Sequence, residues 1–455
     1  MNTYDVIIIG FGKGGKTLAG KMAGAGKNVA LIEKSDKMYG GTCINVGCIP
    51  SKSLVRSSGM ASAHENLPFE KKREFYKKAI EEKRRVTSML RQKNFDKLNN
   101  LEKVTIYNGT ASFQSNTQVK VESADGSESF ILEGKQIFIN TGSRPFVPPI
   151  EGLEGNPQVY LSETLMDLDV LPEKLVIIGG GYIGLEFASM YSGFGSQVTV
   201  IQDGGQFIPR EDEDIAAEIK KVLESKGVRI VVGASIYQVE KQSDKSIVRY
   251  RADGAEYEAE ADAILVATGR RPNVAELNTQ AAGVELTPRG AIKVDEHLKT
   301  TADNIWAMGD VAGGLQFTYV SLDDFRIVWS QLSGGSYNTT QGRNVPYSVF
   351  IDPSFSRVGL NEREARAAGY DVVIKKLPAA AIPKAQVLKK TNGLLKAVID
   401  GKTNKILGAM LFCEESYEMI NIIKLAMDLD ADYQVLADQI YTHPTMSEAL
   451  NDLFA

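Results

Sequence analysis

The sequence predicts an α/β protein with two doubly wound domains followed by a C-terminal α+β domain. An apolar strand, a glycine-rich turn and a helix follow one another near residues 4–33 and again near 174–204. From about residue 338 the pattern changes to short alternating strands and then helices with apolar periodicity. A chain of 455 residues is long enough for about three domains, each with its own core.

The first glycine-rich turn has the spacing of a dinucleotide-binding motif. YDVIIIG (4–10) is the continuous apolar run of a buried parallel strand, and Gly10, Gly12 and Gly15 fit G-x-G-x-x-G at the start of a helix. The first glycine makes the turn, the second lets the backbone approach a pyrophosphate, and the third lets helix and strand pack closely. Glu33 ends the next strand, where a ribose-binding carboxylate belongs. These features predict a Rossmann-like domain.

The second turn repeats this spacing. KLVIIGGGYIG (174–184) places Gly179, Gly181 and Gly184 in the same register, and Gln202 follows Gly179 by as many residues as Glu33 follows Gly10. Two unrelated glycine turns are the alternative, but strand and helix patterns flank both turns. The repeat therefore predicts two bound dinucleotides.

Other apolar runs also end in polar turns: KQIFINTGSRP (135–145), AILVATGRRPN (263–273) and NIWAMGDVAGG (304–314). Ligands bind at the carboxyl edge of a doubly wound sheet, where such strand ends lie. Asp310 could be an ordinary turn aspartate, but its place after a buried strand favours a ligand role.

Charge and hydropathy exclude several classes of partner. The net charge of -5 and the lack of a long Lys/Arg run argue against nucleic acid or an anionic membrane. No stretch has the length of a membrane span, and the N-terminus lacks a signal-peptide pattern, so we expect a cytoplasmic protein. The segment 65–100 reads as a charged amphipathic helix with a solvated face.

GGTCINVGCIPSK (40–52) contains Cys43 and Cys48, in a chain with three cysteines. On an ideal helix their Cα atoms would lie beyond the roughly 4.4–6.8 Å that a disulfide needs, so we expect a distorted backbone, with Gly47 supplying the freedom. A small strained bridge would be labile. A helix starting near Cys48 would favour its thiolate, and Lys52 lies on the same face.

A zinc site is the competing interpretation of this pair. A closed zinc site needs four ligands, and the remaining candidates, Cys413, His64, His297 and His443, are scattered. We therefore expect no resident metal.

HPTMSEAL (443–450) contains a capping box, T-x-x-E, formed by Thr445 and Glu448. It precedes an apolar stripe of Leu450, Leu453 and Phe454 that we expect to suit an interface.

Together, GGTCINVGCIPSK, the two glycine motifs, ATGRRPN, GDVAGG and HPTMSE resemble the flavin-dependent pyridine nucleotide-disulfide oxidoreductases, the family of glutathione reductase, lipoamide dehydrogenase and mercuric reductase. The resemblance covers essentially the whole chain. It implies FAD binding by residues 1–148 and 271–337, NAD(P)H binding by 149–270, and a homodimer formed through 338–455.

The resemblance also implies residue roles. Cys43 would attack the substrate, Cys48 would contact the flavin, and Lys52 would lie near the flavin and pair with Glu186. His443, oriented by Glu448, would be the acid/base catalyst for the opposite subunit; capping and orientation by Glu448 are compatible. Glu33 and Asp310 would hold FAD. Further expected cofactor-binding residues are Gly41, Thr42, Lys52, Ala111, Thr141, Gly142, Ser143, Gly269 and Arg270.

The phrasing GFGKGGKTLA, MYGGTCIN and HPTMSEALNDLF looks most like the bacterial branch with the reactive-chlorine resistance flavoprotein and hypothiocyanous acid reductases. That implies reduction of hypothiocyanous acid, a small-molecule oxidant, in defence against oxidative stress. Reduction of Cu(II), Hg(II), lipoamide or another disulfide stays an alternative, as does a flavin-binding redox sensor without turnover. Gln202 followed by Asp203, with no arginine before Arg210, slightly favours NADH and predicts use of both nicotinamides.

Overall fold

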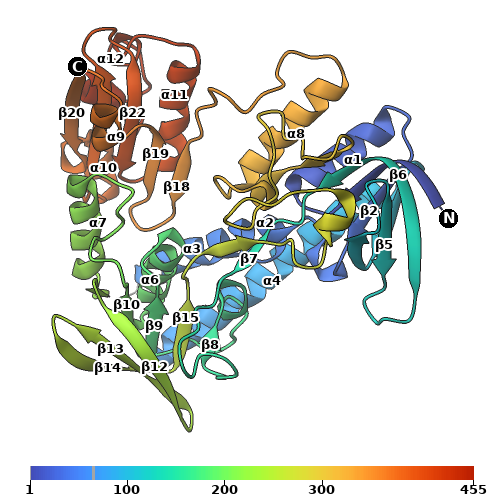
Figure 1. Cartoon of the computed structure of the whole chain (residues 1–455). Coiled ribbons are helices and arrows are strands. Elements are labelled where there is room, and N and C mark those ends of the chain that lie inside the picture. The colour runs from blue at the N-terminus through green and yellow to red at the C-terminus, as the bar shows by residue number, and fades with distance from the viewer. Residues whose placement is uncertain (1, 64–66) are drawn as a thin grey trace. The chain divides into compact units, whose positions relative to one another are not determined.

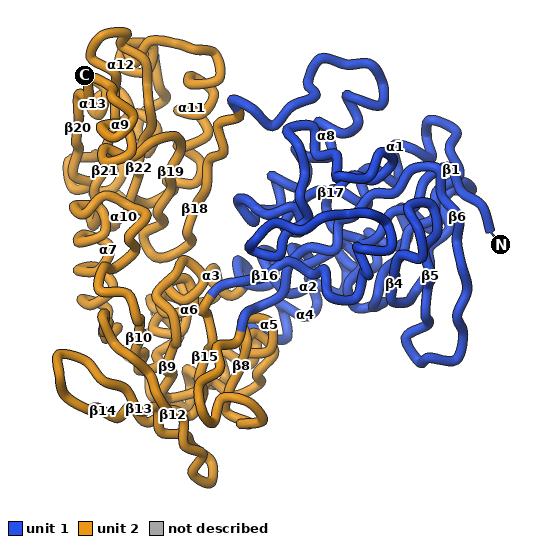
Figure 2. The backbone as a smooth tube through the Cα atoms, in the orientation of Figure 1, with its two compact units in different colours: residues 1–53, 79–146, 269–342 blue, residues 54–78, 147–268, 343–455 orange. Residues whose placement is uncertain are grey.

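The computed structural model describes residues 2–63 and 67–455, so His64 lies outside the described residues. The chain divides into two compact units, shown in different colours in Figure 2. Unit 1 contains residues 1–53, 79–146 and 269–342, and unit 2 contains 54–78, 147–268 and 343–455. The division into four segments at residues 148, 270 and 337 stays a prediction. Within the described residues, no helix combines the length and the apolar character that a membrane span requires.

Unit 1 is built on a sheet with the strand order β3-β2-β1-β6-β5-β4, and β17 also pairs with β6 (Figure 1). The pairs among β3, β2, β1, β6 and β17 are parallel, whereas β5 and β4 are antiparallel additions. The α/β prediction is therefore confirmed for this unit. The strands are β1 (Asn2–Ile9), β2 (Val29–Glu33), β3 (Val104–Asn108), β4 (Thr110–Phe113), β5 (Gln118–Glu122), β6 (Ser129–Ile139) and β17 (Ile305–Ala307), with a separate pair β7 (Ser143–Pro145) and β16 (Arg270–Pro272).

Both faces of the central strands are buried, because alternate side chains point to opposite sides. In β1, Val6 and Ile8 pack with the helices α1 and α8, while Ile7 and Ile9 pack with β4, β5 and the segment 277–311. This explains the unbroken apolar run of β1. The helices that contribute to unit 1 are α1 (Lys13–Gly24), α2 (Thr42–Asn45), α3 (Cys48–Ser62), α4 (Phe69–Asn99) and α8 (Thr318–Leu332), with short 3-10 turns η1 (Asp36–Met38), η2 (Thr279–Ala282) and η3 (Gly309–Ala312).

Unit 2 contains a second parallel sheet with the order β11-β10-β9-β15-β8. An antiparallel sheet, β12-β13-β14, packs against it through a shared apolar core. The elements are β8 (Val159–Tyr160), β9 (Lys174–Ile178), β10 (Gln197–Ile201), β11 (Arg229–Val231), β12 (Ser235–Gln242), β13 (Lys245–Ala252), β14 (Ala255–Ala261), β15 (Ala263–Val266), α5 (Ser162–Leu165), α6 (Tyr182–Phe194) and α7 (Glu213–Ser225).

The C-terminal part of unit 2 is the expected α+β arrangement. Its antiparallel sheet has the order β18-β19-β22-β21-β20. The elements are β18 (Tyr347–Val349), β19 (Phe355–Gly359), β20 (Val372–Pro378), β21 (Leu394–Asp400), β22 (Ile406–Phe412), α9 (Glu362–Ala367), η4 (Ala379–Ala381), α10 (Pro383–Leu388), α11 (Ser416–Asp428), α12 (Gln434–Ala437) and α13 (Ala449–Phe454).

The prediction that the apolar stripe of the terminal helix suits an interface is wrong. Leu450, Leu453 and Phe454 are at most 1% exposed and belong to the same apolar core as β21, β22 and α11. The terminal helix uses its apolar face to close the core of its own subunit. Exposed apolar side chains of this region include Leu429 and Ile440, which are 71% and 92% exposed.

A buried cluster of charges also stabilises unit 2. Lys396 in β21 is 2% exposed and lies 2.9 Å from Asp212, 3.2 Å from Asp214 and 2.8 Å from Glu362. Burial alone would lower the pKa of Lys396, but its hydrogen bonds to Glu362 and Asp212 outweigh burial and raise it. Hydrogen bonds to Lys396 and Arg366 lower the pKa of Glu362. The cluster joins the segment before α7 to the C-terminal sheet.

We expect Lys396→Met to lower the stability of the protein by about 3–5 kcal/mol, because it leaves the buried carboxylate of Asp212 without its cation and takes one cation each from Asp214 and Glu362. Lys376→Met is the matched control, since the side chain of Lys376 is 46% exposed and its bond to Asp214 should contribute at most about 1 kcal/mol. A carboxyl with a lowered pKa stabilises above its unfolded pKa and loses this effect as the pH falls through its folded pKa. The difference in the free energy of unfolding between wild type and Lys396→Met should therefore become smaller at acidic pH. Equal thermal stability of the two variants at neutral pH would contradict this assignment.

Candidate active site

The first glycine loop has the close contacts that its spacing predicts. Gly10 has a φ of +104°, and a Cβ there would lie 2.4 Å from the carbonyl oxygen of Asn140. A Cβ on Gly15 would lie 2.5 Å from the carbonyl oxygen of Gly10. Gly12 precedes α1 and has no side chain, so the backbone stays open to close approach at this point. The N-terminus of α1 favours a negatively charged group.

Glu33 lies beside this loop, as expected. Its Oε2 accepts a hydrogen bond from the amide of Phe11 at 2.9 Å, and its Oε1 accepts one from Ser35 at 3.3 Å. Burial raises the pKa of Glu33, and these backbone hydrogen bonds act against the rise. The carboxylate is thereby held at the end of β2, next to the glycine turn.

The sequence interpretation missed two side chains that hold the loop. Asn140 is 5% exposed; its Oδ1 accepts from the amide of Gly15 at 2.9 Å and its Nδ2 donates to the carbonyl of Met308 at 2.6 Å. The Oγ of Ser321, in α8, accepts from the amide of Gly14 at 3.1 Å. A polar residue directly after the apolar run KQIFI was the available signal for Asn140. Ser321 gave no comparable signal.

The three polar strand ends meet in unit 1. The Oγ of Ser143 donates to Oδ2 of Asp310 at 2.7 Å, and Nε of Arg270 donates to the same Oγ at 2.9 Å. Burial raises the pKa of Asp310, while Ser143 and Arg270 oppose the rise. The hydroxyl of Thr141 donates to the carbonyl of Asn273 at 2.7 Å. Ser143, Arg270 and Asp310, expected cofactor residues from distant sequence segments, thus form one hydrogen-bonded cluster.

The second glycine loop, in unit 2, reproduces the geometry of the first. Gly179 has a φ of +108°, and its Cβ would lie 2.6 Å from the carbonyl oxygen of Ala267. A Cβ on Gly184 would lie 2.1 Å from the carbonyl oxygen of Gly179. Gly181 precedes α6 as Gly12 precedes α1, and neither glycine has a side chain that could cap its helix. The two loops are therefore copies of one structural device.

Gln202 lies 9% exposed at the end of β10. Its Nε2 donates to the carbonyls of Gly204 at 3.1 Å and Gln206 at 2.6 Å. Its Oε1 faces Gly180 in the glycine loop, where an added Cβ would lie 2.2 Å from it. The side chain consequently presents an uncharged acceptor to the nucleotide loop.

The two cysteines lie where two helices begin. Cys43 is in α2, and Cys48 is the first residue of α3. The hydroxyl of Thr318, the first residue of α8, lies 3.4 Å from the sulfur of Cys48. Both residues are thiols in this structure, Cys43 partly buried and Cys48 exposed. The N-termini of α3 and α8 favour negative charge here.

The expected break between the cysteines is confirmed, but the role given to Gly47 needs correction. Helix α2 ends at Asn45 and α3 starts at Cys48, so no continuous helix joins the thiols. Gly47 does not have a positive φ. A glycine suits this position because the backbone of Thr42 lies close to it. A Cβ on Gly47 would lie 3.0 Å from the carbonyl oxygen of Thr42.

Cys43 holds its proton more tightly than an ordinary thiol does. A side-chain hydrogen bond with Cys48, followed by burial, raises the pKa of Cys43, and the hydroxyl of Thr318 opposes the rise. A reaction in which Cys43 is the nucleophile needs a base to take this proton.

A histidine–carboxylate pair lies near the C-terminal end of the chain. Nδ1 of His443 lies 2.7 Å from Oε2 of Glu448, and the side chain of His443 is 70% exposed. The other carboxylate oxygen, Oε1, accepts from the amide of Thr445 at 3.1 Å, while Oγ1 of Thr445 accepts from the amide of Glu448 at 3.2 Å. The capping box is confirmed, and Glu448 also contacts the imidazole. This leaves Nε2 of His443 on the exposed side of the pair.

Comparison with known proteins identifies the family of this chain. Residues 4–324 match the family described as pyridine nucleotide-disulphide oxidoreductase, and residues 345–454 match the dimerisation domain of the same family. The chain belongs to the pyridine nucleotide-disulphide oxidoreductase family.

Full-length relatives and a solved structure agree with this membership. The chain is 48% identical to the probable pyridine nucleotide-disulfide oxidoreductase RclA of Escherichia coli, covering 100% of this chain and 99% of the relative. It is 33% identical to a dihydrolipoyl dehydrogenase of Bacillus subtilis, covering 99% and 97%. A solved structure described as the Cu(II) complex of HOCl-induced flavoprotein disulfide reductase RclA from E. coli superposes with a TM-score of 0.93, at 48% identity and coverage of 100% and 99%.

As a pyridine nucleotide-disulphide oxidoreductase, the protein is an NAD(P)H-dependent flavoprotein that uses FAD. The residues present fit two dinucleotides, since each glycine loop has positions where a Cβ would clash with the backbone, and each loop leads into the N-terminus of a helix. Glu33, Asp310 and the first loop would hold FAD, and the second loop with Gln202 would hold NAD(P)H. Bound FAD supplies the two-electron relay between nicotinamide and thiols.

The remaining expected site residues are dispersed over both units. Gly41 would contact Gly12 if it carried a Cβ, at 2.7 Å, and Thr42 starts α2. Ala111 is buried in β4, and Gly142 and Gly269 have positive φ values. Oε1 of Glu186 accepts from the amide of Phe350 at 2.8 Å. The pairing of Lys52 with Glu186 would join the two units and stays a prediction.

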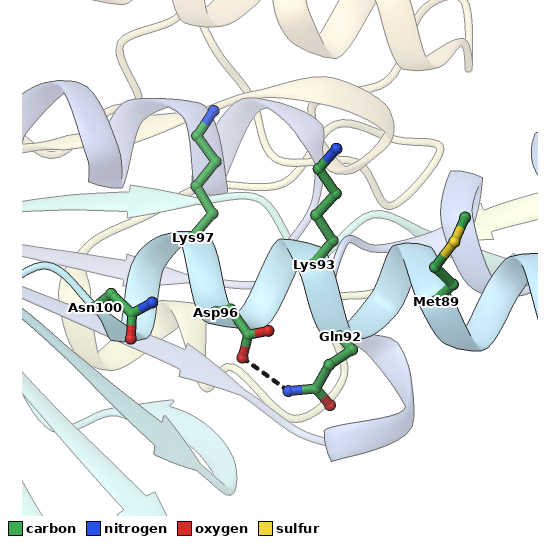
Figure 3. Close-up of a pocket in the computed structure, with 6 residues that line it drawn as sticks. All are labelled: Met89, Gln92, Lys93, Asp96, Lys97 and Asn100. Atoms are coloured by element: carbon green, nitrogen blue, oxygen red, sulfur yellow. Dashed lines mark hydrogen bonds between the residues drawn. The ribbon is translucent and has the colours of Figure 1, made fainter.

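A shallow recess on α4 lies apart from these residues. Figure 3 shows its lining side chains along one face of the helix, with Nε2 of Gln92 donating to Oδ1 of Asp96 at 2.8 Å. The lining residues are Met89, Gln92, Lys93, Asp96, Lys97 and Asn100. None of the expected cofactor or catalytic residues lines it, so the recess gives no support for a catalytic role.

Proposed function

We propose that the protein is a homodimeric reductase of hypothiocyanous acid that uses NADH, accepts NADPH, and carries its electrons through Cys43 and Cys48. The observation that carries this proposal is the thiol pair at the start of two helices, with Cys43 partly buried and Cys48 exposed beside Thr318. Such a pair suits a small electrophilic oxidant, because a nucleophile and a resolving thiol lie side by side.

The oxidant is reduced in two displacement steps. The Cys43 thiolate attacks the sulfur of hypothiocyanous acid; a Cys43 sulfur–sulfur bond forms, the sulfur–oxygen bond breaks, and the leaving hydroxide takes a proton to become water. The Cys48 thiolate then attacks the Cys43 sulfur, and thiocyanate leaves as the disulfide closes. NADH supplies the two electrons that restore both thiols. The partner subunit's histidine equivalent to His443 takes the Cys43 proton and returns one to the hydroxide.

The relatives support a role in reactive-chlorine stress. The E. coli protein that shares 48% of its residues with this chain is described as HOCl-induced. We therefore place this protein in the defence against reactive chlorine and its thiol-specific products. A flavin-binding sensor without turnover is disfavoured, because a sensor does not need a second dinucleotide loop with the geometry of the first.

Reduction of Cu(II) is a second candidate, favoured by the Cu(II) complex of the E. coli relative. A dithiol that becomes a disulfide gives up two electrons, which reduce two Cu(II) ions to Cu(I). Within the described residues, no group of at least three His, Cys, Asp or Glu side chains is arranged to hold a metal ion. The ion would then be a transient substrate of the thiols.

A substrate panel separates these candidates. Purified protein should oxidise NADH at 340 nm with hypothiocyanous acid as acceptor, at a kcat/KM at least about tenfold above that with Cu(II), Hg(II), oxidised glutathione or lipoamide. Preference for Cu(II) would replace the proposal with the second candidate. A protein that reduces its thiols slowly and turns over none of the five acceptors would be a sensor.

The side chain at position 202 gives a prediction for nicotinamide choice. Gln202→Glu should lower kcat/KM for NADPH about tenfold relative to NADH, because a carboxylate repels the 2′-phosphate near a partly solvated site. Asp203→Asn is the matched variant at the exposed neighbouring position and should shift the ratio towards NADPH. Initial rates with both nicotinamides measure the ratio. Parallel changes for both nicotinamides in Gln202→Glu would show that the residue does not face the ribose.

A further inference from the structure

Helix α4 does more than present a charged face to solvent. Arg91, Asn94 and Phe95 are spaced i, i+3 and i+4, so they share one face of the helix. Each of these side chains contacts either the segment 39–45, which contains Cys43, or helix α1. The sequence predicted a solvated amphipathic helix here, and the contacts of this face were not foreseen.

Arg91 holds the loop between the cysteines through Asn45. Nε of Arg91 donates to Oδ1 of Asn45 at 2.8 Å. Nδ2 of Asn45 donates to the carbonyls of Gly41 at 2.9 Å and Tyr39 at 3.1 Å. Both polar atoms of the Asn45 side chain are thus engaged. Because this residue lies between Cys43 and Cys48, a fixed Asn45 fixes the path of the loop.

Two further contacts fasten the same face of α4. The ring of Phe95 stacks on Tyr39 with centroids 4.7 Å apart, and Asn94 accepts a hydrogen bond from Nζ of Lys16. Burial lowers the pKa of Lys16 to about 8, and the nearby thiol of Cys43 acts against this fall. Helix α4 therefore also places a cation near Cys43.

The geometry of the loop matters for the second half of the reaction. Cys48 must reach the Cys43 sulfur along the axis of the bond that breaks, and holding the two groups in place raises their effective concentration. We propose that Arg91 is a positioning residue that holds the cysteine loop, through Asn45, in the geometry from which Cys48 closes the disulfide. This proposal rests on the proposed redox role of the pair.

The test separates attack from closure in the FAD-loaded protein. Protein reduced under anaerobic conditions is mixed with the chromogenic disulfide dithio-bis-nitrobenzoate. Attack by the Cys43 thiolate releases one nitrothiobenzoate and forms a mixed disulfide; attack by the Cys48 thiolate on the Cys43 sulfur releases the second. Stopped-flow absorbance resolves the two releases, and mass spectrometry detects the mixed disulfide.

We expect Arg91→Ala to slow the second release about tenfold and to change the first less than about twofold, since one charge-assisted hydrogen bond to the loop is lost. Arg91→Lys keeps a cationic donor and should recover part of the rate. Arg85→Ala is the control, because Arg85 lies on the exposed side of the same helix, paired with Glu82. If Arg91→Ala does not fold, Asn45→Ala takes its place, because it removes the partner of the same hydrogen bond in the cysteine loop.

Three outcomes would overturn the positioning role, and one of them would overturn the proposed function as well. Equal rates of the second release in wild type, Arg91→Ala and Asn45→Ala would overturn the positioning role and leave the proposed function intact. A wild-type protein that releases only one nitrothiobenzoate would overturn both, because no disulfide then closes. If Arg91→Ala and Arg85→Ala slow closure equally, the effect comes from the helix in general and the specific role of Arg91 is refuted.

Discussion

Replacing Cys43 by serine is expected to abolish turnover of the oxidant, by at least about a thousandfold, because a serine hydroxyl cannot form the sulfur–sulfur bond. The Cys48 thiolate should remain, so the variant should keep the long-wavelength charge-transfer absorbance of a thiolate beside the flavin. Reduction of the bound flavin by NADH should also persist. Stopped-flow spectra and steady-state rates measure these properties in one preparation.

Cys48→Ser and Cys413→Ser complete this experiment. Cys48→Ser should lose the charge-transfer absorbance and consume one equivalent of oxidant without turnover, because Cys43 can attack but its adduct cannot be resolved. Cys413 is buried beside Met419, and burial raises its pKa, so Cys413→Ser should turn over normally. The roles of the two active-site thiols are reversed if Cys48→Ser keeps the absorbance and Cys43→Ser loses it.

His443→Ala is expected to lower turnover by about 10²- to 10⁴-fold, the usual contribution of a general acid/base. The raised pKa of Cys43 is the reason for this large effect, since the nucleophile then depends on a base. His443 is 70% exposed and held by Glu448, as expected of a group that serves another subunit. The mutation should leave the charge-transfer absorbance in place.

Mixed dimers test whether His443 acts across the interface. Inactive Cys43→Ser subunits refolded together with inactive His443→Ala subunits should recover about a quarter of wild-type activity, because about half of the dimers are mixed and each has one complete site. Separate refolding of each variant is the control. If mixed dimers form but stay as inactive as the separate variants, His443 works within its own subunit or outside catalysis.

Local geometry explains which features could be predicted from the sequence. The glycine loops depend on backbone conformations and close approaches that few residues other than glycine allow, so Gly10 and Gly179 reveal them directly. The capping box of Thr445 and Glu448 is equally local, because its partners are three residues apart. Such features need no knowledge of distant contacts.

The missed and incorrect features depend on distant parts of the chain. Thr318 reaches Cys48 from 270 residues away, and Arg91 reaches Asn45 from 46 residues away. Periodicity showed that Leu450 and Leu453 lie on an apolar face, but it does not tell whether that face meets another subunit or the protein's own sheet. Only the fold decides between these two neighbours.

A single-turnover experiment tests the central claim that electrons pass through Cys43 and Cys48 to a small oxidant. Enzyme reduced with one equivalent of NADH is mixed under anaerobic conditions with one equivalent of hypothiocyanous acid. The charge-transfer absorbance should vanish as one thiocyanate per subunit is released, and peptide mapping should find a disulfide between Cys43 and Cys48. Oxidant consumed while both cysteines stay reduced would contradict the account, because the electrons would then leave by another route.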